Sequence, residues 1–268
     1  MSKGFTGFAL IAALLGIYLF ASAPPPLPEA SARSGKSVPV QVLFEICAAE
    51  NAAVRELYTK DIVAAGQGAG LAFDERWRDA GVQAGPLPAL FLRESSQRLA
   101  QNAARLGMFL GSDQPITPAN RFSGAQAQAF EQMRRDRKPR FFVSESGLHT
   151  AMFPDLAVSE ACVSCHNEHE KTPKRDWKLG DMMGATTFTY PSSEVSLDEA
   201  LRVIAALRDS FHGAYAAYTD QAKTFSSPPA IGGQWPTSGY SLPDPARFMA
   251  EAERRASSAT LARLLAMR

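Results

Sequence analysis

The chain has 268 residues and a formal net charge of +1, from 28 Lys and Arg against 27 Asp and Glu. Because positive and negative charges nearly balance, the molecule has no overall field that would attract nucleic acid, and we expect no nucleic-acid partner. Hydrophobic residues make up 46% of the sequence, enough for the packed core of one domain with an extension.

Residues 1–23 are expected to direct export. From Phe5 onward they contain no charged residue, and this run approaches the roughly 20 apolar residues that cross a bilayer. Ala21–Ala23 has the small residues of a signal-peptidase site, but Pro24 follows, which favours a retained anchor. Either outcome places the rest of the chain in the periplasm, tethered to the inner membrane or released from it. Residues 24–38, rich in Pro and Ser, read as a tether.

The stretch from Val38 to Gly66 predicts a long helix that ends at the glycine. Its apolar residues recur at intervals of three and four: Leu43, Ile46, Val54, Leu57 and Tyr58. Cys47 shares that apolar face. Taken alone, a cysteine on such a face usually fills space in a core.

A basic run, Arg134–Arg140, precedes a strand-like stretch that starts at Phe141 and passes through His149. We interpret the run as the solvated end of a helix; the alternative is a docking patch for a partner or an anionic group.

Cys162 and Cys165 are separated by two residues, and His166 follows directly. This spacing lets two thiols reach the two vinyl groups of one porphyrin, with the histidine beneath the iron. A zinc site would need a second pair of ligands, and the third cysteine, Cys47, is more than a hundred residues upstream. Behind an export segment, the motif predicts one covalently bound haem c, which leaves Cys47 without a disulfide partner in the chain.

The sequence from Cys162 to Pro191 resembles a family of PAS-like single-haem c-type domains, formerly described only as a domain of unknown function. After its CxxCH motif this family has a short loop and a Gly-Asp-x-x-Gly-Ala strand, which here is Gly180–Ala185. The resemblance covers residues 39–191. It implies an α+β fold in which helices flank an antiparallel sheet, and a sensor role in bacterial signalling proteins, although no kinase, cyclase or chemotaxis module follows on this chain.

The same resemblance implies a second axial iron ligand at Cys47, because a helix cysteine serves that role in the family. A thiolate there would favour ferric iron and a low reduction potential. Packing of Cys47 in the core is the alternative.

Other side chains are weaker candidates for the second ligand. His169 is tethered on the same side of the haem as His166, and His149 is better suited to line the pocket. Met182 and Met183 are expected to pack in the core or on a strand, and His212 to have a role outside coordination.

Residues 192–268 are expected to form a helical extension, packed on the haem domain or on a second copy in a homodimer. Ser196 and Glu199 form a capping box at the start of a helix over 196–225. An irregular loop follows, and then an amphipathic helix over 246–268.

Two functions fit these features: redox or ligand sensing, with a signalling protein as partner, or electron transfer with a redox partner in the periplasm or membrane. An enzyme is not expected, since six-coordinate iron leaves no substrate site and no nucleophile–base arrangement stands out.

Overall fold

The computed structural model describes residues 37–236 and 239–266. The described residues belong to one compact unit, 36–268. The predicted export segment and almost all of the predicted tether therefore lie outside the described residues. Among the helices that are described, none has the length and apolar character needed to span a bilayer.

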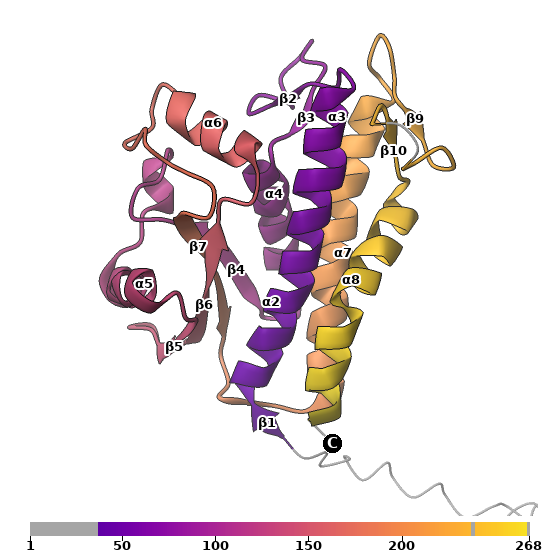
Figure 1. Ribbon diagram of the computed structural model, residues 1–268. Helices are drawn as coiled ribbons and strands as arrows, with labels where there is room; N and C mark the ends of the chain where they lie inside the picture. Colours follow the sequence, from indigo (N-terminus) through magenta and orange to yellow (C-terminus); the bar gives the residue numbers. More distant parts are fainter. Residues whose placement is uncertain (1–36, 237–238, 267–268) are drawn as a thin grey trace, which may run out of the picture. The chain divides into compact units, whose positions relative to one another are not determined.

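The elements appear in Figure 1. Helices and strands in chain order are β1 (Val38–Pro39), α2 (Val40–Glu56), η1 (Leu57–Ala64), α3 (Ala65–Gly68), β2 (Phe73–Asp74), β3 (Gly85–Pro86), α4 (Pro88–Ala100), β4 (Gly107–Gly111), η2 (Pro118–Asn120), α5 (Gly124–Asp136), β5 (Arg140–Val143), β6 (His149–Leu156), α6 (Glu160–Glu168), β7 (Met182–Tyr190), β8 (Glu194–Val195), α7 (Leu197–Ala222), β9 (Ala230–Ile231), β10 (Ser241–Leu242) and α8 (Pro245–Ala266).

A four-stranded antiparallel sheet, in the order β4-β7-β6-β5, lies between helices. Because side chains alternate along a strand, Ala151 and Phe188 enter the main core with α2, whereas Met152 and Ala185 pack against α5 on the opposite face. Figure 1 shows α2, α7 and α8 side by side on one side of the sheet and α5 on the other. The α+β prediction of an antiparallel sheet flanked by helices, with a C-terminal helix, is confirmed.

The first long helix differs from its predicted bounds at both ends. Val38 and Pro39 pair with β8, so the helix begins at Val40. It continues without a break through η1, an eight-residue π-helical stretch, to Gly68. Gly66 does not stop it; the left-handed residue after the helix is Gly70, with φ of +97°.

The Ser196 half of the predicted capping box is confirmed: Ser196 Oγ accepts a hydrogen bond from the Glu199 backbone N–H at 3.3 Å. The Glu199 carboxylate instead accepts from Tyr190 and Arg105. Both C-terminal helices share the main core with α2 and α4. The residues after 191 are therefore packed into the same core as those before it.

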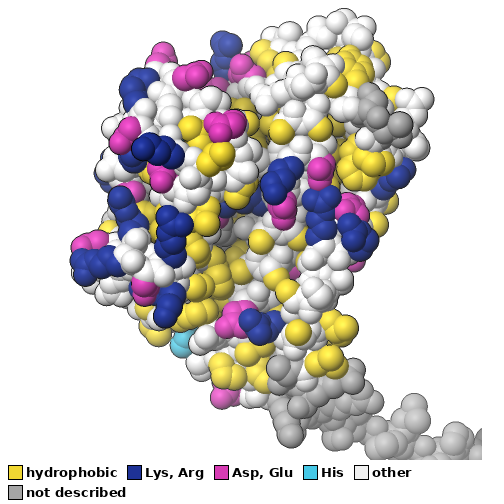
Figure 2. All heavy atoms as spheres, viewed as in Figure 1, with side chains coloured by type: hydrophobic (Ala, Val, Ile, Leu, Met, Phe, Trp, Pro, Cys, Tyr) yellow, Lys and Arg dark blue, Asp and Glu magenta, His cyan; other side chains and the backbone are white. Residues whose placement is uncertain are grey.

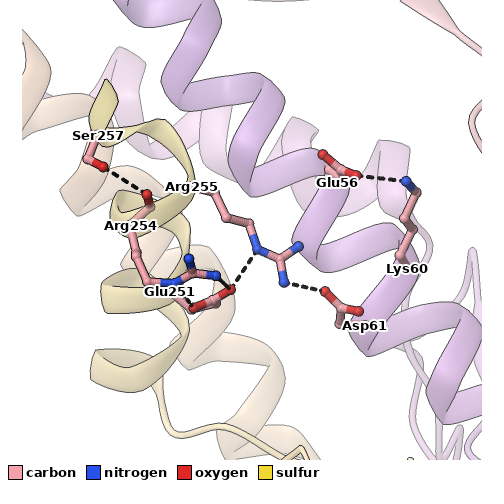
Figure 3. Close-up of polar contacts among 7 residues, drawn as sticks. All are labelled: Glu56, Lys60, Asp61, Glu251, Arg254, Arg255 and Ser257. Atoms are coloured by element: carbon pink, nitrogen blue, oxygen red, sulfur yellow. Dashed lines mark hydrogen bonds and ion pairs between the residues drawn. The ribbon is translucent and has the colours of Figure 1, made fainter. Parts of the chain in front are cut away.

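Polar contacts join α8 to the first long helix along much of its length. Glu50 of α2 is almost fully buried and accepts hydrogen bonds from Arg208 at 2.7 Å and from Thr260 at 2.7 Å. Figure 3 shows Arg255 of α8 between Glu251 and Asp61, the latter in η1, with a distance of 2.7 Å between Arg255 and Asp61. These contacts couple the position of the Cys47 helix to that of α8.

Candidate functional site: the CxxCH helix and the recess beside α2

The CxxCH residues lie on a short helix, α6, which begins four residues after the end of β6. Ser159 has an extended backbone and precedes the first helical residue, and its carbonyl accepts from the Cys162 N–H at 3.0 Å. Cys162 and Val163 pack on a small cluster that contains Trp177 and Met183. Both motif cysteines are free and half-buried.

The motif histidine has an unused buried nitrogen. His166 Nδ1 has no hydrogen-bond partner among the described residues, and Trp177 meets the imidazole edge-on, with ring centroids 6.5 Å apart. Burial, followed by the charges of His169 and Arg55, lowers the pKa of His166. The imidazole is therefore held neutral, the form in which histidine binds metals.

Arg55 ties α2 to the strand that leads into the motif. Its guanidinium forms an ion pair with Asp155 and donates to the Leu156 carbonyl at 3.3 Å. Thr186 of β7 donates to Asp155 at 3.0 Å. The motif helix is thus held beside the C-terminal half of α2.

Cys47 lies farther down the same helix. It is fully buried in the main core. Burial, assisted by the charge of Glu50, raises the pKa of its thiol. Cys47 is eight residues before Arg55, or ~12 Å along the axis at 1.5 Å per residue.

An apolar sheet face next to α2 is only partly covered. Phe141 is 38% exposed and Val143 is 56% exposed, both on the edge strand β5. The ring of Phe153 in β6 contacts that of Phe141 edge to face, with centroids 5.9 Å apart. Figure 2 shows the surface hollowed between the sheet and α2, with hydrophobic side chains along it. We call this hollow the recess; its walls are Phe141, Val143 and Phe153 on the sheet and the sheet-facing side of α2.

The residues present fit a covalently bound haem. Two free thiols one helical turn apart and a neutral histidine with an orphaned nitrogen lie just beyond the end of β6. The partly covered apolar face extends from Phe153, near that end, to Phe141 and Val143, which pair with the start of β6. A haem attached to α6 would find hydrophobic surface beside α2. By contrast, no three His, Cys, Asp or Glu side chains in the described part of the chain converge as ligands of a metal ion.

The weaker candidates for the second iron ligand lie in different parts of the structure. His169 contacts Glu75 through Nε2 at 3.1 Å, and His212 is exposed on α7. Met182 and Met183 are buried in two different clusters. His149 stands on the recess side of the sheet, because its register partner is Val143.

The basic run before β5 is largely paired. Arg134 forms an ion pair with Asp113, Arg135 with Glu131 and Arg140 with Asp136. The solvated helix end is the interpretation that fits.

Sequence reasoning missed Arg55, Asp155 and Trp177. The first had a signal: Cys47, Asn51 and Arg55 follow one another at intervals of four, so they form one stripe along the helix. Asp155 and Trp177 acquire their roles only through contacts between distant segments.

Comparison with known proteins gives one family. Residues 40–191, more than half of the chain, match the model of the Tll0287-like family, described as Tll0287, a family of c-type haem sensor domains. None of the curated proteins and none of the solved structures gives a match.

Proposed function

From the fact that the chain belongs to the Tll0287-like family, and from the geometry of the recess, we propose that it is a haem-based sensor. Cys162 and Cys165 would hold one haem c through thioether bonds, and His166 would bind its iron. When bound, the haem supplies an iron whose oxidation state and second axial ligand can change.

The observation that supports this proposal best is a partly covered apolar sheet face that extends along α2 from the strand end next to the motif to Phe141 and Val143. Phe141 and Val143 are large hydrophobic side chains that remain exposed, which is costly unless a partner covers them. His166 Nδ1 is buried without a hydrogen-bond partner, and a metal ion is a partner that a neutral imidazole nitrogen commonly takes.

Cys47 is proposed as the second residue that would bind the iron. The recess runs from the motif helix along α2 in the direction of Cys47. Its thiol is protonated in the apolar core, so coordination would require loss of that proton. Anionic sulfur would then favour the ferric state.

Hydrogen bonds of α2 suggest how a change in the position of Cys47 would be transmitted to the C-terminal helices. Cys47 and Glu50 are three residues apart on α2, and Glu50 is bonded to α7 through Arg208 and to α8 through Thr260. A shift of α2 would therefore disturb both C-terminal helices. The signal would reach a partner through them: a signalling protein or a second copy of the chain.

We further propose that the protein works in the periplasm, with residues 1–23 as a membrane anchor or cleaved leader. Electron transfer to a redox partner is the alternative, and the family match does not favour it.

The experiment that separates the two functions is hydrogen–deuterium exchange of the haem-loaded protein, oxidised and reduced. A sensor should show different exchange rates in α2 and α8 between the two states. A protein whose helices exchange identically in both states, while its haem is fully redox-active, would be an electron carrier instead.

A further inference from the structure

One buried polar group on α2, between Cys47 and Arg55, has no partner. Asn51 is 5% exposed, and its Oδ1 has no hydrogen-bond partner among the described residues. Leaving a buried amide oxygen unpaired is destabilising, so such groups are rare without a reason.

Asn51 stands between the two ends of the site. It is four residues after Cys47 and four before Arg55, and each step of four advances ~6 Å and turns about 40° around the axis. Arg55 reaches the end of β6 next to His166, as its ion pair with Asp155 shows. Side chains four apart share a face, so Asn51 lies on the stripe that leads from the motif to Cys47.

The chemistry of the group limits what can satisfy it. A carboxamide offers both an acceptor oxygen and an NH₂ donor, and a rotation exchanges the two. On the sheet side of the recess, Phe141, Val143 and Phe153 supply no polar partner, and His149 lies opposite Val143 at the start of β6, away from the motif. A small ligand that enters the recess and accepts a hydrogen bond would find its donor at Asn51.

We propose that Asn51 is the specificity-determining residue of the sensor: its carboxamide donates a hydrogen bond to a small exogenous ligand that replaces Cys47 at the iron. This inference rests on the proposed function. It predicts preference for ligands with a good acceptor atom, such as cyanide, over weak acceptors such as carbon monoxide.

The test uses the haem-loaded full chain carrying Cys47→Ala, which opens the ligand position, with Asn51→Leu or the smaller Asn51→Ala added. Cyanide is titrated into the ferric protein and carbon monoxide into the ferrous protein. Loss of one hydrogen bond should weaken cyanide binding about five- to tenfold, and carbon monoxide binding by no more than about twofold. Both Asn51 variants should show this change in the cyanide-to-monoxide ratio.

Thr59→Val is the matched control. Thr59 lies on the same continuous helix, is 1% exposed, and its Oγ1 is likewise unpartnered, but it lies beyond Arg55 in η1. The control should leave both affinities unchanged.

The inference is overturned if the Asn51 variants bind cyanide as the Thr59 variant does, or if both ligands weaken equally, which indicates a structural role. A haem-loaded Cys47→Ala protein that takes no cyanide also overturns it, since no ligand then reaches Asn51. If the unmodified chain contains no haem, the proposed function itself is rejected.

Discussion

At the residue scale, replacement of Cys47 distinguishes its two possible roles, packing in the core and coordination of the iron. Cys47→Ala should leave the haem attached, since the thioethers and His166 remain, but convert low-spin thiolate-bound iron to high-spin or water-bound iron with a higher reduction potential. The ferric absorption spectrum and a potentiometric titration measure this. Val54→Ala, at another fully buried position on the same helix face, is the control and should change neither.

If Cys47 only fills the core, its replacement removes one small buried group and costs about 1 kcal/mol of unfolding free energy. An unaltered spectrum and potential would then reject ligation, and His149, on the recess side of the sheet, would be substituted next.

Arg55 offers a second test at this scale, because its side chain is 22% exposed and that of Asp155 is 14% exposed. Arg55→Met leaves a half-buried carboxylate with Thr186 as its remaining side-chain partner. We expect a loss of about 1–3 kcal/mol in the unfolding free energy, measured by urea denaturation of haem-free protein.

The exposed pair Lys60–Glu56 provides the comparison. Lys60→Met should cost no more than about 0.5 kcal/mol, since surface pairs contribute little. Equal effects of the two substitutions would show that Arg55 does not hold α2 to the sheet.

At the element scale, the contact between α8 and the first long helix should respond to pH. Hydrogen bonds from Arg254, aided by Arg255, lower the pKa of Glu251 from 4.5 to about 2. A carboxyl whose pKa is depressed in the folded state stabilises it above the unfolded pKa, and that contribution is lost as the pH falls. The window is therefore from about pH 4.5 down to about pH 2.

Urea denaturation of the protein across this window should show stability falling with pH, and the slope should be smaller in Glu251→Gln. The pairs of Glu251 with Arg254 and Arg255 are partly exposed, so added salt should reduce the effect. An identical slope in the glutamine variant would mean that other carboxyls carry the acid sensitivity.

The elements also show what a sequence can predict. The i, i+3, i+4 spacing of apolar residues predicts the Cys47 helix, and the Ser196–Glu199 capping box predicts the start of α7, because both signals are local. The prediction that the helix ends at Gly66 was wrong, because glycine also occurs where neighbouring groups pack closely. A Cβ at Gly66 would lie 3.1 Å from the Phe73 ring.

Other features depend on distant contacts. The CxxCH spacing gives the motif itself, but the recess exists only because β5 is an edge strand whose apolar face α2 leaves open. The ion pair between Arg55 and Asp155 joins positions 100 residues apart, and no local pattern encodes it.

At the scale of the whole molecule, the family match ends at residue 191, whereas the core does not. Phe211, Tyr215 and Phe248, from α7 and α8, are fully buried. Tyr58 of η1 packs against the rings of Tyr215 and Phe248, and Phe91 of α4 packs against Phe248. A chain shortened after Pro191 should therefore expose a large apolar surface and lose cooperative unfolding, as measured by circular dichroism during heating.

A shortened chain that still unfolds cooperatively would show instead that the extension is dispensable for the fold. Removal of residues 1–36 behind a cleavable export signal is the matched comparison, because the described fold begins at Ser37. That protein should be soluble, periplasmic and loaded with haem.

The most direct test of the account is whether haem stays on the polypeptide after denaturation. The full chain, produced with the haem-attachment machinery of the periplasm, is unfolded and extracted with acidified organic solvent, and its intact mass is then measured. We predict one haem per chain, retained through extraction and lost in the Cys162→Ser, Cys165→Ser double variant. Haem that leaves with the solvent, or a mass equal to that of the bare polypeptide, would contradict covalent attachment and with it the proposed sensor.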